Sequence, residues 1–483
     1  MEDIADQPSA RRSGTRTSSF GVGRREGHDS TAFYERFQTP EISTDDQVAP
    51  PKCIDRLIVG DARHMGDVAD NSVALVVTSP PYFAGKEYEE ALGHGHVPAT
   101  YIQYLEQLRD VFSECVRVLE PGGRIAINVA NLGRRPYRSL SADITTILQE
   151  DLRLLLRGEV LWIKQRGAAG NCAWGSFQRP GNPVIRDLSE RVIIASKGRF
   201  DRAISAKDRA KIGLPSISSL TRDEFMEATV DVWEIPPERA SRVGHPAPFP
   251  VALPERLIHM NTYVGDLVLD PFVGSGTTAV AAARTGRSYI GYDTEAEYVE
   301  AARRRVAEEG TSQHGLSTVG LLAIDGRKTE PLRGGWSSKE IAKWLLTEAA
   351  FTNIDDQAMV LPSVLPTLRA TDHAGRTWWV EVVGGRTSNR PGAVRLDLLW
   401  RAISKGAVVR QVDPSAGFVI LTVDQPASAS GGRALAAVTG AGKPVTAVVD
   451  MLSETAVSVL AALGNVPLDA PVTHGSRPRD RAF

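Results

Sequence analysis

The sequence predicts an α/β fold in which a largely parallel sheet binds a nucleotide-like ligand, followed by a smaller α/β domain. Apolar, strand-like runs alternate with helical segments between residues 53 and 309, which is the pattern of a parallel sheet covered by helices. A glycine-rich turn joins one of these strands to the helix after it. With 483 residues, the chain is long enough for two or more domains.

The predicted ligand site centres on LVLDPFVGSGTT at Leu267–Thr278. Its apolar start indicates a buried strand that ends at Asp270, and a helix opens directly after the glycine turn, at Thr277. A strand, a glycine loop and a helix N-terminus bring backbone N–H groups close to a ligand. The strand-like Ser288–Tyr292 ends in Asp293, about twenty residues on, where nucleotide-binding folds place an acid that binds ribose.

The other elements of the main domain, residues 53–309, follow from apolar runs and from apolar residues at helical spacing. The predicted strands are Ile54–Val59, Val73–Val77, Arg124–Val129, Gly158–Lys164, Val192–Ser196, Leu267–Leu269 and Ser288–Tyr292. The predicted helices are Ala99–Leu119, Ile144–Leu156, Ser205–Lys211, Thr221–Glu227, one from Leu253, Thr277–Ala283 and Glu295–Glu309. Pro121-Gly122-Gly123 is expected to stop the first of these helices.

A second domain is predicted at 336–470, because a capping box at Ser337 and Glu340 opens a new run of elements. Its elements are a helix Lys339–Phe351, a hairpin of Leu365–Thr371 and Arg376–Val383, a helix Val394–Gly406, a strand Gly417–Val423 and a helix Ser453–Leu463. The remaining segments are expected to be flexible or linking: 1–52, with a short docking helix at Phe33, Tyr34 and Phe37; the linker 310–335; and the mobile tail 471–483.

Composition narrows the class of protein. Hydrophobic content of 42% and charged content of 24% are ordinary for a soluble chain, and no apolar run approaches the ~20 residues of a membrane span. The first residues lack a signal-peptide core, so a cytoplasmic protein is expected. Cys53, Cys115 and Cys172 are far apart, so we expect neither a zinc site nor a disulfide framework. The net charge of −2 leaves room for a local basic face.

A second chemical motif, Thr78-Ser79-Pro80-Pro81-Tyr82, follows the strand Val73–Val77. Two consecutive prolines remove two backbone donors and stiffen the loop. A fixed carbonyl, a hydroxyl and an aromatic ring together suit a planar base that carries an amino group. The ring stacks on the base and the oxygens accept the hydrogens of the amine. A plain strand-ending turn is the alternative for this motif taken by itself.

TSPPY together with DPFVGSGTT resembles the amino-methylating DNA methyltransferases, which modify an exocyclic amine with S-adenosylmethionine. The resemblance runs from about residue 54 to 308. It includes Asn71-Ser72-Val73, Arg117–Gly123, His245–Pro250 and Gly286–Asp293. It implies a Rossmann-like methyltransferase sheet. Because TSPPY precedes the glycine loop, the motif order resembles the circularly permuted β group.

The resemblance implies a cofactor site whose methionine end lies at the glycine loop. Asp270, Gly274 and Gly276 would line that end of S-adenosylmethionine. Phe272 and Thr277 would flank it.

Four further residues complete the predicted cofactor site. Asp293 would hold the ribose hydroxyls, and Asp61 would lie near the adenine. Phe249, in HPAPFP, would cover the far side of the cofactor, and Thr78 joins the cofactor-binding set. Asp293 as a helix cap, Asp61 as a turn residue and Phe249 as plain core are the structural alternatives.

The resemblance also places the catalytic residues at Ser79, Pro80, Pro81 and Tyr82. Ser79 and the carbonyl of Pro80 would accept the two amine hydrogens, and Tyr82 would stack on the base. No histidine or lysine adjoins Ser79 in the sequence, so it is interpreted as an orienting acceptor and not as a nucleophile. No metal is expected, and the base must leave a duplex before it can react.

The amino-acid sequence leaves alternatives open for the target base and for the overall activity. In this family a serine at the position of Ser79 favours cytosine N4, whereas Asp or Asn favours adenine N6, and Thr78-Ser79 argues against methylation of a protein glutamine. The lead function is a site-specific DNA methyltransferase that acts on cytosine N4, with adenine N6 as the alternative. A single-chain restriction-modification enzyme and a non-catalytic DNA-binding protein are the other candidates.

The expected partner is double-stranded DNA. The oligomeric state, including a dimer or a role in a defence system, stays open.

The residues that recognise the DNA sequence are predicted less precisely than the cofactor-binding and catalytic residues. Candidate DNA-reading stretches are Lys164–Gly181, Arg134-Arg135 and 199–243, although solvated loop charge explains each of them equally well.

The second domain resembles the core of restriction nucleases. Its carboxylate Glu381 ends a strand, but Val383 stands where the metal-binding pattern needs a lysine that Lys405 would have to replace. The domain is therefore expected to be degenerate as a nuclease, and a DNA-binding or target-recognition module and an assembly module are the alternatives. Arg386, Arg390 and Arg395 are candidates for phosphate contacts.

Overall fold

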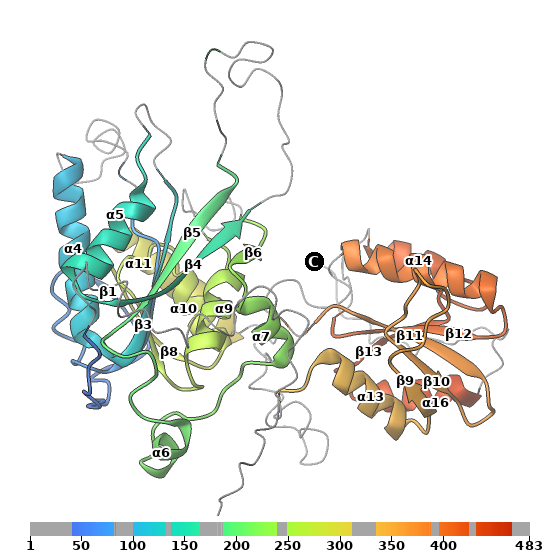
Figure 1. Ribbon diagram of the computed structural model, residues 1–483. Helices are drawn as coiled ribbons and strands as arrows, with labels where there is room; N and C mark the ends of the chain where they lie inside the picture. Colours follow the sequence, from blue (N-terminus) through green and yellow to red (C-terminus); the bar gives the residue numbers. More distant parts are fainter. Residues whose placement is uncertain are drawn as a thin grey trace, which may run out of the picture. The chain divides into compact units, whose positions relative to one another are not determined.

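The computed structural model describes residues 41–81, 83, 100–131, 137–164, 181, 185, 187–238, 249–311, 335–385, 387, 396–424 and 431–465. Within these residues the strands form two sheets, one of eight strands and one of five (Figure 1). The larger sheet belongs to the predicted main domain and the smaller one to the predicted second domain. No helix in the described ranges is long and apolar enough to cross a membrane.

The eight-stranded sheet has the order β1-β8-β7-β2-β3-β5-β4-β6. Its strands are β1 (Arg56–Val59), β2 (Val73–Thr78), β3 (Leu119–Val129), β4 (Leu155–Ile163), β5 (Ser189–Ser196), β6 (Val232–Glu234), β7 (Leu267–Asp270) and β8 (Ser288–Asp293). Only β5 runs against its neighbours, because it is antiparallel to both β3 and β4, whereas every other pair is parallel. The predicted largely parallel sheet is therefore confirmed.

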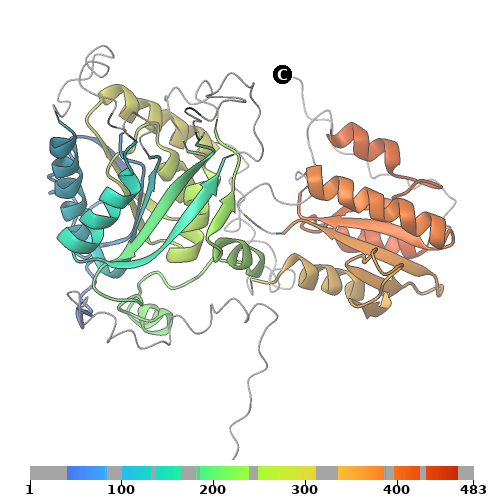
Figure 2. The same cartoon turned by 45° about the horizontal axis from the view of Figure 1, so that its top comes forward.

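Helices cover both faces of this sheet, as Figures 1 and 2 show. On one face, α4 (Tyr101–Val118) and α5 (Leu140–Thr146) bury their apolar sides against the strands. On the other face, α9 (Ala252–Asn261) and α10 (Thr277–Arg284) close a second core. The last helix of the domain, α11 (Ala296–Thr311), packs against α10 and β1. The burial of apolar side chains on both faces explains why the strands are almost continuously hydrophobic.

The connections between the strands reverse direction between β7 and β2. The helix α10 joins β7 to β8 over one face, and α4 joins β2 to β3 over the other. These two central strands are parallel neighbours, with Leu75 opposite Val268 and Val76 opposite Leu269. In an open α/β sheet, ligands bind where such a reversal separates the carboxyl ends of two strands. The TSPPY loop leaves β2 at this point and the glycine loop leaves β7.

Two predicted boundaries differ from the structure. The helix expected at 144–156 begins at Leu140 and ends in a π-helical turn, Ile147–Asp151. Arg153 then has a φ of 54°, a left-handed conformation that stops the helix without a glycine, and β4 begins at Leu155. The helix before Pro121 ends at Val118 as expected, but β3 begins directly at Leu119 and runs irregularly through the glycines.

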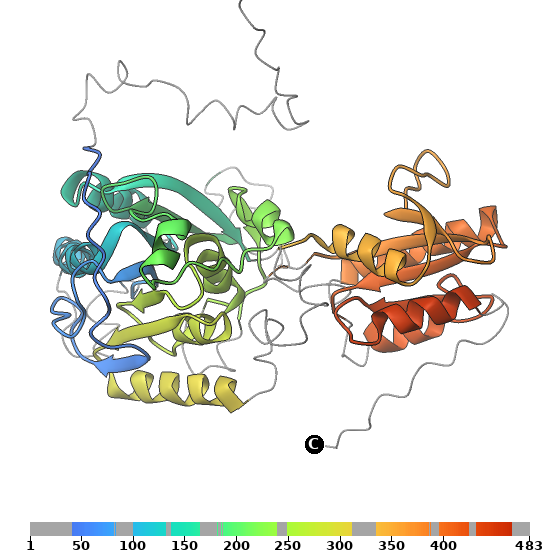
Figure 3. The ribbon, with the colours of Figure 1, turned by 90° about the horizontal axis from the view of Figure 1, so that it is seen from below.

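The interval 199–238 holds the two short helices that the sequence predicts there. It contains α6 (Ala206–Lys211) and α7 (Arg222–Ala228), which appear in green in Figure 3. Arg209 of α6 lies buried with Glu120 and Asp266, and its guanidinium donates to Asp266 Oδ1 at 2.8 Å. Arg202 joins the same cluster. These two arginines of a predicted DNA-reading stretch therefore bind carboxylates inside the protein and are not available to phosphates.

The five-stranded sheet has the order β13-β12-β11-β10-β9. Its elements in chain order are α13 (Ser338–Glu348), β9 (Thr352–Asp355), β10 (Leu368–Thr371), β11 (Thr377–Val383), α14 (Leu396–Val412), β12 (Gly417–Thr422), α15 (Gly431–Val438), β13 (Ala447–Asp450) and α16 (Ala456–Asn465). The predicted hairpin is present, since β10 and β11 are antiparallel. The helices α13 and α16 pack on one face and α14 packs on the other (Figure 1).

Some predictions lie outside the described residues. They are the docking helix with Phe33, Tyr34 and Phe37, the side chain of Tyr82, the stretches Arg134-Arg135 and 165–180, residues 245–248, the linker 312–334, the arginines 386, 390 and 395, and the tail 471–483.

Candidate active site

The two chemical motifs are tied together at a buried carboxylate, that of Asp270. The hydroxyl of Thr78, at the end of β2, donates to Asp270 Oδ1 at 2.6 Å. The hydroxyl of Thr278, in the first turn of α10, donates to Oδ2 at 2.7 Å. The backbone N–H of Phe272 adds a third donor to Oδ1, at 3.1 Å. The loop after β2 and the loop after β7 are thereby fixed to one another, although 192 residues separate Thr78 from Asp270.

Burial dominates the electrostatics of this carboxylate. Asp270 is 2% exposed, and desolvation raises its pKa to about 6, against the opposing effect of the hydrogen bonds from Thr78 and Thr278. Thr78 and Thr278 are themselves fully buried. Thr78, predicted to bind the cofactor, is therefore placed so that it positions Asp270. Thr278, which is not among the residues predicted from the sequence, shares that role. Its signal was its place at the start of the helix after the glycine loop.

The glycine loop has backbone conformations that other residues adopt rarely. Gly274 and Gly276 have φ angles of 46° and 84°. A Cβ on Gly276 would lie 2.7 Å from Cβ of Ala302, so α11 can pack against the loop only because this residue has no side chain. Arg305, also on α11, donates to the carbonyl of Ser275 at 2.6 Å. The turn is thus held rigidly in front of the N-terminus of α10.

The predicted ribose-binding acid, Asp293, lies at the carboxyl end of β8 and touches the glycine loop. Its Oδ2 accepts the backbone N–H of Gly274 at 2.9 Å, and its Oδ1 accepts that of Glu295 at 3.0 Å. The second contact supports the start of α11, so the residue also acts as a cap. A carboxylate oxygen can accept more than one hydrogen bond.

Asp61 lies close to Asp293, because β1 and β8 are parallel neighbours and Val59 is the register partner of Asp293. Asp61 follows β1 by two residues. Its carboxylate pairs with Arg63, whose Nε donates to Oδ2 at 2.9 Å, and this hydrogen bond lowers the pKa of Asp61. The predicted adenine-side and ribose-side acids therefore occupy the same edge of the sheet.

The TSPPY loop is braced from below by α4. Pro80 is buried and Ser79 half-buried, whereas Pro81 is exposed. The hydroxyl of Tyr104 donates to the carbonyl of Pro81 at 2.9 Å.

An aromatic cluster extends this brace. The ring of Phe83, just past the loop, packs on Tyr104 and Tyr101 at centroid distances of 5.5 and 5.7 Å. Tyr104 is not among the residues predicted from the sequence. Its signal was its place in the first turn of the amphipathic helix that follows the motif.

The remaining predicted cofactor residues are Phe272, Phe249 and Thr277. Phe272 packs against the core on the α4 side of the sheet, and Phe249 packs against the core on the α9 side. Thr277 is buried at the first position of α10, where Arg305 donates to its hydroxyl at 3.3 Å. The structure therefore brings the described site predictions other than Phe249 to the carboxyl ends of β1, β8, β7 and β2.

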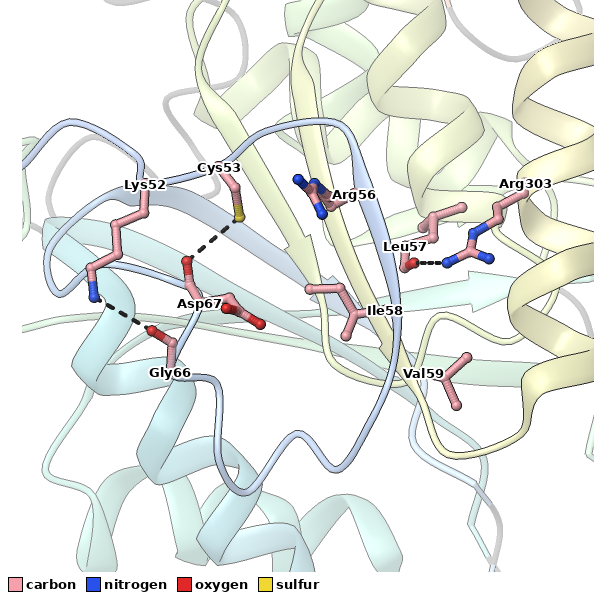
Figure 4. Close-up of a pocket in the computed structure, with 9 residues that line it drawn as sticks. All are labelled: Lys52, Cys53, Arg56, Leu57, Ile58, Val59, Gly66, Asp67 and Arg303. Carbon is pink, nitrogen blue, oxygen red and sulfur yellow. Dashed lines mark hydrogen bonds between the residues drawn. The ribbon is translucent and has the colours of Figure 1, made fainter.

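A separate cavity of about 480 Å³ lies beside β1 (Figure 4). Lys52, Cys53, Asp67 and Arg303 contribute to its wall, and Cys53 Sγ donates to the carbonyl of Asp67 at 3.5 Å. None of the predicted site residues lines this cavity. It is distinct from the two-loop site.

The sheet order, the glycine loop and the acids at the carboxyl-terminal edge of β8 and β1 define the class of Rossmann-like methyltransferases. Comparisons with known proteins then identify the family. The sequence matches the DNA methylase family over residues 73–304. It is 31% identical to the Type II methyltransferase M.BglI of Bacillus subtilis, over 51% of this chain and 84% of the relative. It is also 31% identical to the Type II methyltransferase M.MjaI of Methanocaldococcus jannaschii, over 50% and 87%.

The chain belongs to the family of DNA methyltransferases that modify the N4 or N6 amine of a base, and its methyl donor is S-adenosylmethionine. Among solved structures, a putative DNA modification methylase of Thermus thermophilus, in complex with S-adenosyl-L-methionine, is 32% identical to it. That match covers 53% of this chain and 95% of the other, with a TM-score of 0.41.

Proposed function

We propose that this methyltransferase transfers a methyl group to N4 of cytosine in double-stranded DNA, at a specific sequence. The observation that supports the proposal most directly is the bond between Thr78 and Asp270. It joins the loop with the predicted base-binding residues to the loop with the predicted cofactor-binding residues. Because positioning of the two reactants supplies much of the rate in such a transfer, a fixed link between the two half-sites is what the reaction requires.

The described residues fit the cofactor. Asp293 and Asp61 offer carboxylates at adjacent strand ends, and the glycine loop presents the N-terminus of α10. When bound, S-adenosylmethionine supplies the methyl group, whose bond to sulfur breaks as the amine nitrogen forms the new N–C bond. In our assignment Asp270, Gly274 and Gly276 line its methionine end, with Phe272, Thr277 and Phe249 beside it and Thr78 behind Asp270.

In the proposed mechanism, the TSPPY loop prepares the amine. The lone pair of a cytosine amine is conjugated into the ring, so the amine is a poor nucleophile. Ser79 Oγ and the carbonyl of Pro80 accept its two hydrogens and favour a tetrahedral nitrogen. Tyr82 stacks on the flipped base, and Pro81 is held in place by Tyr104. The methylated amine releases one proton to solvent.

Ser79 is the reason for choosing cytosine N4, and adenine N6 is the alternative. The family includes enzymes of both kinds. We also assign the chain to the circularly permuted β group, because the TSPPY motif precedes the glycine loop. With DNA as its substrate, we place the enzyme in the cytoplasm.

The experiment is expression of the full chain in a host without DNA methylation, followed by single-molecule sequencing and nucleoside mass spectrometry of the host DNA. We expect N4-methylcytosine at one short sequence. N6-methyladenine alone would overturn the choice of base. Unmodified DNA in cells that contain the folded protein would overturn the proposed activity.

For the second domain, residues 336–470, we propose that it contacts DNA without cutting it. The order of α13, three antiparallel strands, α14 and a parallel β12 supports a restriction-nuclease-like core. Lys405 Nζ lies 2.6 Å from Glu381 Oε1, and the backbone N–H of Thr367 donates to Glu381 Oε2 at 3.0 Å. Both oxygens of the Glu381 carboxylate therefore already have hydrogen-bond partners within the domain.

The part of the chain that the structure describes holds no cluster of three or more metal-ligating side chains. Incubation of unmethylated DNA with excess enzyme and Mg²⁺ is expected to leave the DNA intact. Cleavage that a Glu381→Ala variant abolishes would instead make the chain a single-chain restriction-modification enzyme.

A further inference from the structure

A row of polar side chains lies on the strands next to the TSPPY loop. Asn128 is in β3, Glu190 is in β5, and Lys164 directly follows β4. The amide Nδ2 of Asn128 donates to Glu190 Oε2 at 2.5 Å, and Lys164 forms an ion pair with the same carboxylate. The ammonium of Lys164 also lies over the ring of Trp162, 5.4 Å from its centroid. The three side chains thus form one connected chain of contacts across three strands.

The strand register places this row beside the predicted catalytic serine. Thr78 of β2 is the register partner of Ile127 of β3. The next residues along the two chains are Ser79 and Asn128. Because neighbouring parallel strands lie about 4.8 Å apart, these two residues adjoin at the carboxyl edge of the sheet.

The alternation of side chains puts the two residues on the same face. Val77 and Ala126, two positions before Ser79 and Asn128, both belong to the core on the α9 side. Successive side chains of a strand point to opposite faces, so Ser79 and Asn128 share the face of Val77 and Ala126. Phe249, predicted to lie beside the cofactor, packs against that same core.

One acceptor in this row has no partner. Asn128 is 2% exposed, and its Oδ1 makes no hydrogen bond within the described part of the chain. Glu190 fixes the orientation of the amide, because an ionised carboxylate accepts hydrogen bonds and so selects Nδ2. The oxygen is therefore turned away from Glu190 and needs a donor. Buried polar atoms that lack partners are rare and often belong to functional sites.

We propose that Asn128 is a substrate-binding residue whose Oδ1 shares one hydrogen of the exocyclic amine of the flipped base with Ser79 Oγ in a three-centre hydrogen bond, while the carbonyl of Pro80 accepts the other hydrogen. The inference rests on the proposed function, because it extends the site of Ser79 and Pro80 by one strand. Glu190 is a positioning residue, which orients the amide of Asn128 and is itself neutralised by Lys164. Acceptors from two adjacent strands then face the amine, and the site recognises a base only if it carries an amino group.

The test compares Asn128→Ala with wild type on two duplex oligonucleotides that contain the recognised sequence. In one duplex the target nucleotide is intact, and in the other it is abasic. We expect the variant to bind the intact duplex about tenfold more weakly and the abasic duplex with unchanged affinity. Equal losses on both duplexes, or no loss on either, would overturn the proposal.

Two further variants keep the test decisive. Glu190→Gln preserves the shape of the side chain but no longer selects one orientation of the Asn128 amide. It should therefore weaken binding of the intact duplex and leave binding of the abasic duplex unchanged. This variant takes the place of Asn128→Ala in the test if Asn128→Ala does not fold. The control variant is Asn261→Ala. The amide of Asn261, at the end of α9, donates to the carbonyl of Leu257, and its removal should leave the binding of both duplexes as in wild type.

The outcome separates this proposal from the proposed function. Wild-type enzyme that transfers no methyl group to DNA overturns the function. Wild-type transfer with Asn128→Ala equally active and equally tight on both duplexes overturns only the role of Asn128. Cofactor binding, measured by calorimetry, is expected to be the same in all variants.

Discussion

Asp270 is the residue on which the two halves of the site converge, and its ionisation has a cost. Burial raises its pKa to about 6, whereas an exposed aspartate in the unfolded chain titrates near 3.8. The protonated form is therefore favoured in the folded state. The stabilisation that the folded state gains from holding this proton is complete below about pH 4 and is lost as the pH rises through 6.

The Asp270→Asn variant lacks this titration. Relative to the variant, the free energy of unfolding of wild type should fall by about 3 kcal/mol between pH 4 and pH 8, since one pKa unit corresponds to about 1.4 kcal/mol. Urea unfolding of both proteins across that range measures the difference. Two curves that stay parallel over the whole range would contradict the raised pKa of the buried Asp270 carboxyl.

Gly276 offers a second prediction for a single residue. A Gly276→Ala change places a methyl group 2.7 Å from Ala302 and also strains a φ of 84°. We expect a loss of about 2 to 4 kcal/mol in unfolding free energy and weaker binding of S-adenosylmethionine. Gly213→Ala is the matched control, because Gly213 has a φ of 75° and open space around it. The control should lose only about 1 kcal/mol and bind the cofactor normally. Equal behaviour of the two variants would show that packing of α11 on the glycine loop is unimportant.

At the scale of elements, buried ion pairs attach α6 to the amino ends of β3 and β7. Arg209 is paired with Asp266 and Glu120, and all three are buried. Removing one partner of such a cluster leaves an uncompensated charge, so Arg209→Met should lower the free energy of unfolding by about 3 to 5 kcal/mol.

The same helix supplies the control. Lys211 pairs with Asp208 at the surface, and Lys211→Met should leave the stability close to that of wild type. Chemical denaturation measures both variants. The KM for DNA should be the same in each, because this cluster lies at the edge of the sheet opposite the two-loop site. A large rise in KM for Arg209→Met would restore the prediction that this stretch reads DNA.

The elements that the sequence predicts well are those with strong local patterns. The strand before TSPPY, the strand before the glycine loop and the helix from Thr277 lie within a residue or so of their predicted ends. Short strands such as β6 and β13 lack enough residues to show a period, and the helix that stops at Arg153 does so without glycine or proline. Tertiary packing decides these cases, and propensity does not.

At the scale of the whole molecule, the site was predictable because each motif ends a strand. What the sequence alone could not show is how distant residues meet. The hydroxyl of Tyr104 on Pro81, the ion pairs of Arg202 and Arg209, and the orphan oxygen of Asn128 all depend on strand order. Charged residues in a polar stretch look alike in sequence whether they face DNA or a buried carboxylate.

The central claim is that two loops on adjacent strands form one methyl-transfer site. The most direct measurement is transfer of a tritiated methyl group from S-adenosylmethionine to unmethylated DNA by wild type, Ser79→Ala and the control Ser288→Ala, with cofactor affinity measured in parallel. We predict that Ser79→Ala binds the cofactor like wild type and loses about a hundredfold or more in transfer rate, whereas Ser288→Ala stays active. Full activity of Ser79→Ala, or a loss that merely follows weaker cofactor binding, would contradict the account.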